Sequence, residues 1–215
     1  TFFDSGALLD AVVVTQDPPL YFLRDGATLI RTDPSPLLQF TNSPQTFDSA
    51  LVICCNSSAS LAGPLLRATD SDLNVAFSLV SLLQDGTLST SSGDPLVLLE
   101  RGTHSLGAAV GVFDIAGVTT AQDAKTGLHL GSDRPLQHGG VLLETSGARV
   151  TTERFVKLDT ALLEASAPLL KLTAGSAMTS AKGLVAVGPK ASLVGDLPSD
   201  ALIKLNASTL TVNNG

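Results

Sequence analysis

One short hydrophobic pattern recurs along nearly the whole chain. Its clearest copy is Pro168-Leu169-Leu170-Lys171-Leu172, in which two apolar residues, a variable residue and a third apolar residue follow in order. A polar turn and one further apolar anchor, here Met178, complete the copy. The copies recur about every 15 residues, a period typical of repeat architectures. Thirteen copies are recognisable, and they begin at Leu20, Leu37, Leu51, Leu65, Leu79, Leu96, Val112, Gly127, Leu142, Phe155, Leu169, Leu184 and Leu202.

The alternation within each copy predicts β-strands. Apolar-variable-apolar is a period of two, and no stretch shows a sustained helical stripe. Gly, Ser, Asn, Asp and Pro separate the strands, as at Asp25-Gly26 and Gly188-Pro189, because these residues favour turns. The second anchors are Leu29, Phe47, Leu61, Leu88, Leu106, Leu136, Val150, Leu163, Met178, Leu193 and Leu210. Each copy therefore predicts two short strands joined by a turn.

The repetition predicts the architecture. Short strands at regular spacing also occur in sandwiches and barrels, but those folds do not need one pattern thirteen times. A solenoid does, because each turn rests on a similar neighbour. We therefore predict an all-β fold, a parallel β-solenoid with short strands and a repeat of about 15 residues. Residues 1–18 form an irregular first rung, a cap or a donated strand, and residues 19–215 form the repeat domain.

The length of one turn stays open at this stage. About 15 residues suffice for two short strands and two turns around a thin core, so we take one copy as one turn. A turn of about 30 residues built from two copies is the alternative. Proline cannot donate to a strand ladder and is expected at corners of the coil. It precedes the first leucine at Pro36, Pro64, Pro95 and Pro168.

Composition narrows the function classes. Hydrophobic residues make up 44% of the 215 residues, aromatic residues only 4%, and Trp is absent, which suits a narrow aliphatic core. The net charge of −7 and the lack of a Lys/Arg cluster argue against a nucleic-acid partner. No apolar run approaches the ~18 residues of a membrane-spanning helix. No phosphate-loop, dinucleotide or nucleophile motif is present, so we expect no cofactor and no enzymatic activity.

The first leucine of each copy has two interpretations. Strict alternation would point it away from the core, which would create an exposed apolar stripe for a partner. Alternatively, the chain turns a corner there, and two successive side chains face inward. The positions concerned are Leu20, Leu37, Leu51, Leu65, Leu79, Leu96, Leu142, Phe155, Leu169, Leu184 and Leu202.

The variable position predicts an outward polar stack. With one copy per turn, Asp114, His129, Glu144 and Lys157 would lie about 4.8 Å apart in one column. Carboxylates around a histidine can bind a metal or perform acid–base chemistry. The favoured interpretation is a solvated charge ladder in which opposite signs support each other weakly.

Three weaker candidates remain. A polysaccharide-active enzyme on a parallel β-helix would need clustered carboxylates, for which Asp114, Glu144 and Asp159 are the candidates. Asp70-Ser71-Asp72 resembles the start of a calcium loop but lacks its glycine and glutamate. Residues 110–126 form the least regular copy, and irregular insertions on solenoid edges are common binding places.

Cys54 and Cys55 are the only cysteines, and they are adjacent. Adjacent cysteines lie closer together than ordinary disulfide partners, so two reduced thiols are favoured. A vicinal disulfide and a link between chains through Cys55 are the alternatives.

The repeat resembles the Leu/Ser/Thr-rich β-solenoids of large bacterial surface proteins, such as filamentous-haemagglutinin-like adhesins and autotransporter passengers. The resemblance rests on Pro-Leu-Leu-x-Leu at 168–172 and on the Gly/Ser/Asn turns, and it runs from about Leu20 to Leu210. The resemblance implies export, a cell-surface or extracellular location, and a structural or adhesive role.

We therefore expect a structural protein whose partner is itself. Open strand edges at the ends of a solenoid are ready to pair, so copies would join end to end or laterally into a filament or surface layer. The alternatives are an adhesin stalk or passenger segment of a larger surface protein, with cell-surface carbohydrate as a partner, and the polysaccharide-active enzyme.

Overall fold

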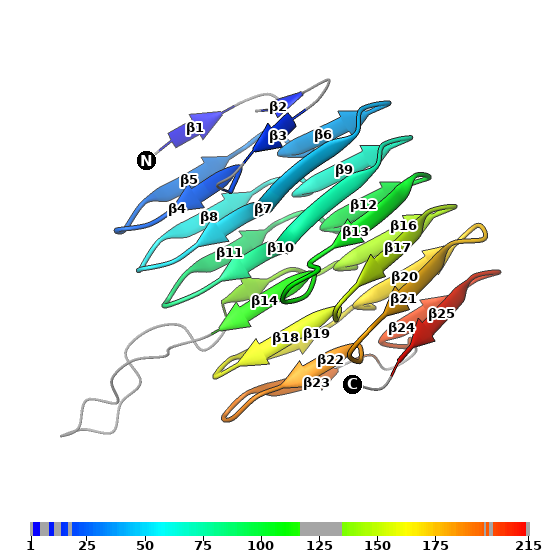
Figure 1. The fold of residues 1–215 in the computed structure, drawn as a ribbon. Helices are drawn as coiled ribbons and strands as arrows, with labels where there is room; N and C mark the ends of the chain where they lie inside the picture. Colours follow the sequence, from blue (N-terminus) through cyan, green and yellow to red (C-terminus); the bar gives the residue numbers. More distant parts are fainter. Residues whose placement is uncertain are drawn as a thin grey trace.

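The structure is a computed structural model that describes residues 2–4, 9–10, 14–16, 19–116, 135–195, 197 and 200–213. All strand pairs in the described residues are parallel, and these residues contain no helix. The strands stack into a coil of about six turns (Figure 1). The predicted parallel β-solenoid is confirmed. The copy at Gly127 lies outside the described residues.

Each turn contributes strands to four columns, which we number in the order in which the chain passes through them. Column 1 contains β1 (Phe2–Asp4), β5 (Thr28–Arg31), β8 (Ser58–Leu61), β11 (Thr87–Thr90), β15 (Leu136–Gln137), β19 (Leu162–Ala165) and β23 (Ser192–Gly195). Column 2 contains β2 (Leu9–Asp10), β6 (Leu38–Thr41), β9 (Leu66–Thr69), β12 (Val97–Glu100), β16 (Leu143–Ser146), β20 (Leu170–Thr173) and β24 (Ile203–Leu205).

Columns 3 and 4 are joined into one sheet by two long strands, β7 (Gln45–Ile53) and β10 (Leu73–Leu82), each of which runs through both columns. Column 3 also contains β3 (Val14–Gln16), β13 (Thr103–Leu106), β17 (Arg149–Thr152), β21 (Ala177–Ser180) and β25 (Thr209–Val212). Column 4 also contains β4 (Tyr21–Leu23), β14 (Phe113–Ala116), β18 (Val156–Asp159) and β22 (Val185–Val187). In Figure 1 the long strands lie in front of the shorter strands of columns 1 and 2.

The register shows that one turn contains two copies of the repeat. Leu38 pairs with Leu66, 28 residues later, and Leu170 pairs with Ile203, 33 residues later. Val185 lies in another column, where it pairs with Val156. The expectation of one copy per turn is therefore wrong. The twelve copies outside the one at Gly127 alternate strictly between column 4 and column 2, because the two halves of a turn use the same strand pattern on opposite sides of one core.

One turn is longer than the others. Val97 pairs with Leu143, 46 residues later, whereas the other turns measured at this column take 27 to 33 residues. The long turn contains residues 117–134, which lie outside the described residues. The predicted irregular segment 110–126 falls partly here, since residues 113–116 form β14 and join the ladder normally.

The core is a file of aliphatic side chains that continues from turn to turn. At the corner before each column-2 strand, two successive residues both face inward, so that Leu37 and Leu38 are each 0% exposed. The other first leucines are buried as well, apart from Leu20, Leu184 and Leu202, which are partly buried and pack against the core. The corner interpretation is confirmed, and the exposed apolar stripe does not form.

The corner between columns 2 and 3 needs a left-handed backbone at one residue in every turn. Asn42, Asp70, Arg101 and Ala174 occupy this position with φ between 51° and 61°. Asn and Asp adopt this conformation more readily than most residues, which explains part of the turn composition. Ser71 lies just after the corner, where its hydroxyl donates to the Thr69 carbonyl and accepts from the Ser43 amide one turn earlier.

Candidate functional site

The structure separates the members of the predicted polar stack. Asp114 lies on β14 in column 4, where the Lys157 ammonium one turn later lies 3.2 Å from its carboxylate. Glu144 lies on β16 in column 2, and its carboxylate accepts from Lys171 at 2.8 Å. His129 is outside the described residues. A single stack fails because successive copies alternate between two columns, although charge ladders between successive turns do form.

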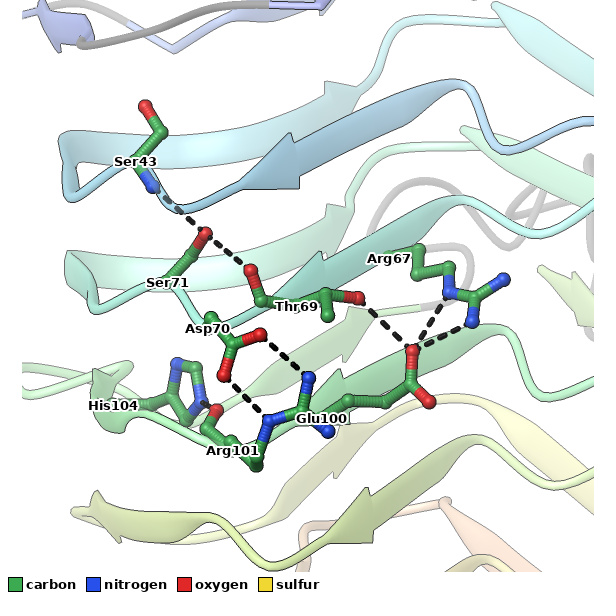
Figure 2. Close-up of polar contacts among 8 residues, drawn as sticks. All are labelled: Ser43, Arg67, Thr69, Asp70, Ser71, Glu100, Arg101 and His104. Carbon is green, nitrogen blue, oxygen red and sulfur yellow. Dashed lines mark hydrogen bonds and ion pairs between the residues drawn. The ribbon is translucent and has the colours of Figure 1, made fainter.

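Figure 2 shows the densest group of polar contacts, at the corner between columns 2 and 3. The Arg67 guanidinium donates to Glu100 Oε2 through Nε at 2.9 Å and Nη2 at 2.7 Å. The Thr69 hydroxyl donates to the same oxygen at 3.0 Å. The hydrogen bonds from Arg67 hold the pKa of Glu100 below its usual value. These contacts join β9 to β12 on the outer face of two successive turns.

The next residues of the same corner form a second ion pair. Arg101 donates to Asp70 through Nε and Nη2, with both distances 2.5 Å, and this contact lowers the pKa of Asp70. Beside the pair lies an open groove of about 410 Å3, lined by Asn42, Pro44, Asp70, Asp72 and Gly102. Asp72 accepts a hydrogen bond from the Thr103 amide at 2.7 Å.

The groove contains the residues that resemble a calcium loop, but their carboxylates are engaged elsewhere. Asp70 binds Arg101, and Asp72 caps β13 through the Thr103 amide. Within the described ranges, no group of three His, Cys, Asp or Glu side chains is arranged to hold a metal ion. What this corner does is fasten neighbouring turns to one another through side chains.

His104 is a polar residue inside the core. It takes the inward position between Leu73 and Val150 in column 3 and is 0% exposed. Its Nε2 donates to the Arg101 carbonyl at 3.0 Å, while its Nδ1 has no hydrogen-bond partner among the described residues. Burial lowers the pKa of His104, so the ring is held neutral. Sequence reasoning placed this histidine in a strand or turn without a partner and missed its core position.

Column 1 is interrupted beside the long turn. The ladder ends at β15 and resumes with the separate pair β19–β23, although columns 2, 3 and 4 continue without a break. A cavity of about 670 Å3 lies at the interruption; its lining includes Gln137, His138, Glu164, Ser166 and Val194.

His138 belongs to the wall of this cavity. The Val141 carbonyl, 3.1 Å from Nε2, can only accept, so Nε2 donates and Nδ1 accepts from the Thr90 hydroxyl at 2.5 Å. Burial lowers the pKa of His138. Both ring nitrogens are therefore occupied in positioning the loop that follows β15, and the histidine is not free to act on a ligand.

The turn formed by β22 to β25 exposes residues at core positions. Val187, Ile203 and Leu205 are 53%, 37% and 49% exposed. Their ladder partners one turn earlier are Leu158, Leu170 and Leu172, each no more than 1% exposed. Each of β22, β23, β24 and β25 pairs on one side only within the described chain. We call this surface, made of Val187, Ile203 and Leu205 with the free strand edges, the end face.

Comparison of the chain with protein-family models, with curated proteins and with solved structures finds no match. What is established is thus the parallel β-solenoid itself, and the resemblance to surface adhesins rests on the repeat pattern. In the part of the chain that the structure describes, no helix has the length and apolar character needed to cross a membrane.

Proposed function

We propose that this protein is an extracellular structural β-solenoid that joins with copies of itself end to end into a filament or surface layer. The observation that carries the proposal is the end face, where core positions that are buried in every earlier turn are exposed. The extracellular location follows from the resemblance to surface adhesin solenoids.

The end face supports a second copy as its partner for two reasons. Fully burying a Val, Leu or Ile side chain contributes about 1.5–3 kcal/mol, so covering Val187, Ile203 and Leu205 would stabilise a junction. The free edges of β23, β24 and β25 also offer backbone donors and acceptors to parallel strands, as in β-strand addition.

The opposite end offers strands of the matching kind. β1, β2 and β3 each pair with a strand on one side only, and they run parallel to the rest of their columns. Head-to-tail stacking would therefore keep all strands parallel. A contact that repeats head to tail without closing generates a filament rather than a closed ring.

Sedimentation velocity and negative-stain imaging of the 215-residue chain over a range of concentrations test the proposal. We expect species that lengthen along one axis as concentration rises. Ile203→Lys and Leu205→Lys should shift the chain to monomer, because each places a charge on the end face, while circular dichroism should stay unchanged because both side chains are already half exposed.

Val194→Lys is the matched control. Val194 lies on β23 in the same turn and is 48% exposed, but it is the ladder partner of Glu164, which points outward from the coil. This variant should polymerise like the wild type. A wild-type chain that stays monomeric at all concentrations would refute the proposal, and loss of assembly in Val194→Lys alone would point to lateral rather than end-to-end contacts.

A further inference from the structure

The two adjacent cysteines lie together at the corner between columns 4 and 1. Cys54 follows β7 directly and is 8% exposed, whereas Cys55 is partly exposed. Both are free thiols, and their Sγ atoms are 2.7 Å apart, with the Cys55 thiol donating to Cys54 Sγ. Neither sulfur needs a large movement to meet the other.

Neighbouring turns hold this corner in place. The Cys54 amide donates to the Leu23 carbonyl of the preceding turn at 2.9 Å. The Cys55 amide donates to the Gln84 carbonyl of the following turn at 2.8 Å, and the Gly26 amide donates to the Cys55 carbonyl at 3.1 Å. The backbone of both cysteines is therefore fixed from above and below, which keeps the two side chains on one side of the corner.

The two thiols have different environments. Burial, followed by the hydrogen bond from Cys55, raises the pKa of the Cys54 thiol to about 11. Cys54 therefore remains a thiol at neutral pH and is a poor nucleophile, since the thiolate is the reactive form. Cys55 is the sulfur that an external reagent reaches first, and its Sγ lies 3.4 Å from Gln84 Oε1 at the surface.

We propose that Cys54 and Cys55 form a reversible vicinal dithiol site that takes a low-molecular-weight disulfide as its oxidant. The Cys55 thiolate attacks one sulfur of the small disulfide, forms a mixed disulfide and releases one small thiolate. Cys54 Sγ, which loses its proton to solvent, then attacks Cys55 Sγ and releases the second small thiol. Two protein thiols are oxidised to one disulfide, and one small disulfide is reduced to two thiols.

The geometry favours a reversible site over a structural bridge or a metal centre. Adjacent Cα atoms are about 3.8 Å apart, below the usual 4.4–6.8 Å of disulfides, so the closed ring is easier to reduce than an ordinary bridge. No third ligand accompanies the two sulfurs in the described residues. Two sulfurs this close also suit capture of a single trivalent arsenic atom, which provides a probe for the reduced form.

Intact mass spectrometry tests the proposal. The reduced 215-residue chain is incubated with oxidised glutathione, alkylated with iodoacetamide and weighed. We expect a mass lower by two hydrogen atoms, no retained glutathione and no alkylation, with dithiothreitol restoring two reactive thiols. In Cys54→Ser the glutathione should remain on Cys55, because no second thiol displaces it. Cys55→Ser should react on the order of tenfold more slowly, because only the thiol with the raised pKa remains.

A second measurement separates the pair from a single reactive thiol. Phenylarsine oxide condenses with two thiols and releases water, so an immobilised phenylarsine should retain the reduced wild type and neither single variant. A wild type that keeps glutathione on Cys55, or that forms a disulfide between chains on a non-reducing gel, overturns the proposal. Equal retention of the wild type and a single variant on the arsenical overturns it too.

Discussion

Replacing Gly63 by alanine probes how closely successive turns approach. Gly63 lies at the corner that leads into column 2, and a Cβ placed on it would lie 2.1 Å from the Pro34 carbonyl oxygen and 2.7 Å from the Ser35 carbonyl oxygen. Both atoms are backbone of the preceding turn. Gly93, near the same corner one turn later, has no atom within 4 Å of its ideal Cβ and is the matched control.

The size of the effect follows from these distances. Carbon atoms pack best at roughly 3.5–4.0 Å, so the alanine methyl would force the two corners apart by more than about 1 Å. Overpacking of this kind costs about 1–3 kcal/mol. Both substitutions also restrict the unfolded chain, which stabilises by about 0.4–1 kcal/mol and cancels when the two variants are compared. We expect Gly63→Ala to be about 1–3 kcal/mol less stable than Gly93→Ala.

Urea unfolding followed by circular dichroism measures the difference. The two variants should differ in the transition midpoint at equal m-value, because the surface exposed on unfolding is the same. In thermal unfolding, each kcal/mol should appear as about 2–4 °C for a chain of this size. Midpoints that agree within about 0.5 kcal/mol would refute the close stacking of the corners on Pro34.

Two further predictions concern the core. Burial depresses the pKa of His104 in the folded state, so the unfolded chain binds the proton more tightly; stability is present above the unfolded pKa of about 6.5 and is lost as the pH falls. His104→Leu should therefore flatten the loss of stability between about pH 7.5 and about pH 5.5 in urea titrations, and an unchanged slope would contradict this origin. Phe113 is fully buried and meets Phe155 edge-on at 5.6 Å, so Phe113→Ala should cost about 3–5 kcal/mol. Combining it with Phe155→Ala should cost less than the two single changes together, whereas strict additivity in the double-mutant cycle would show that the rings are not coupled.

The strand pattern was enough to predict the fold, because inward aliphatic positions and turn residues recur with a fixed spacing. The number of copies per turn was not predictable from that spacing, since both halves of a turn carry the same pattern. The prolines did hold the missing signal. Pro36, Pro64, Pro95 and Pro168 precede column-2 strands, so they mark every second copy and report a period of about 30 residues.

The candidate sites depended more strongly on that choice. Asp114 and Glu144 were expected in one stack because the copies were counted singly, and they separate once columns 2 and 4 are distinguished. The partners of Arg67 and Asp70 lie 33 and 31 residues away, a spacing that single-copy turns do not bring together. The inward position of His104 follows from its alignment with Leu73, which is visible only when the true turn length is used.

The pairing of two copies in each turn limits how such a gene can change in length. Unequal recombination that gains or loses a single 15-residue unit would exchange the roles of columns 2 and 4 in everything that follows, and would put proline corners and outward ion pairs out of phase. Gain or loss of two units keeps the phase and changes the molecule by one rise of about 4.8 Å. Relatives of this protein should therefore differ by whole turns.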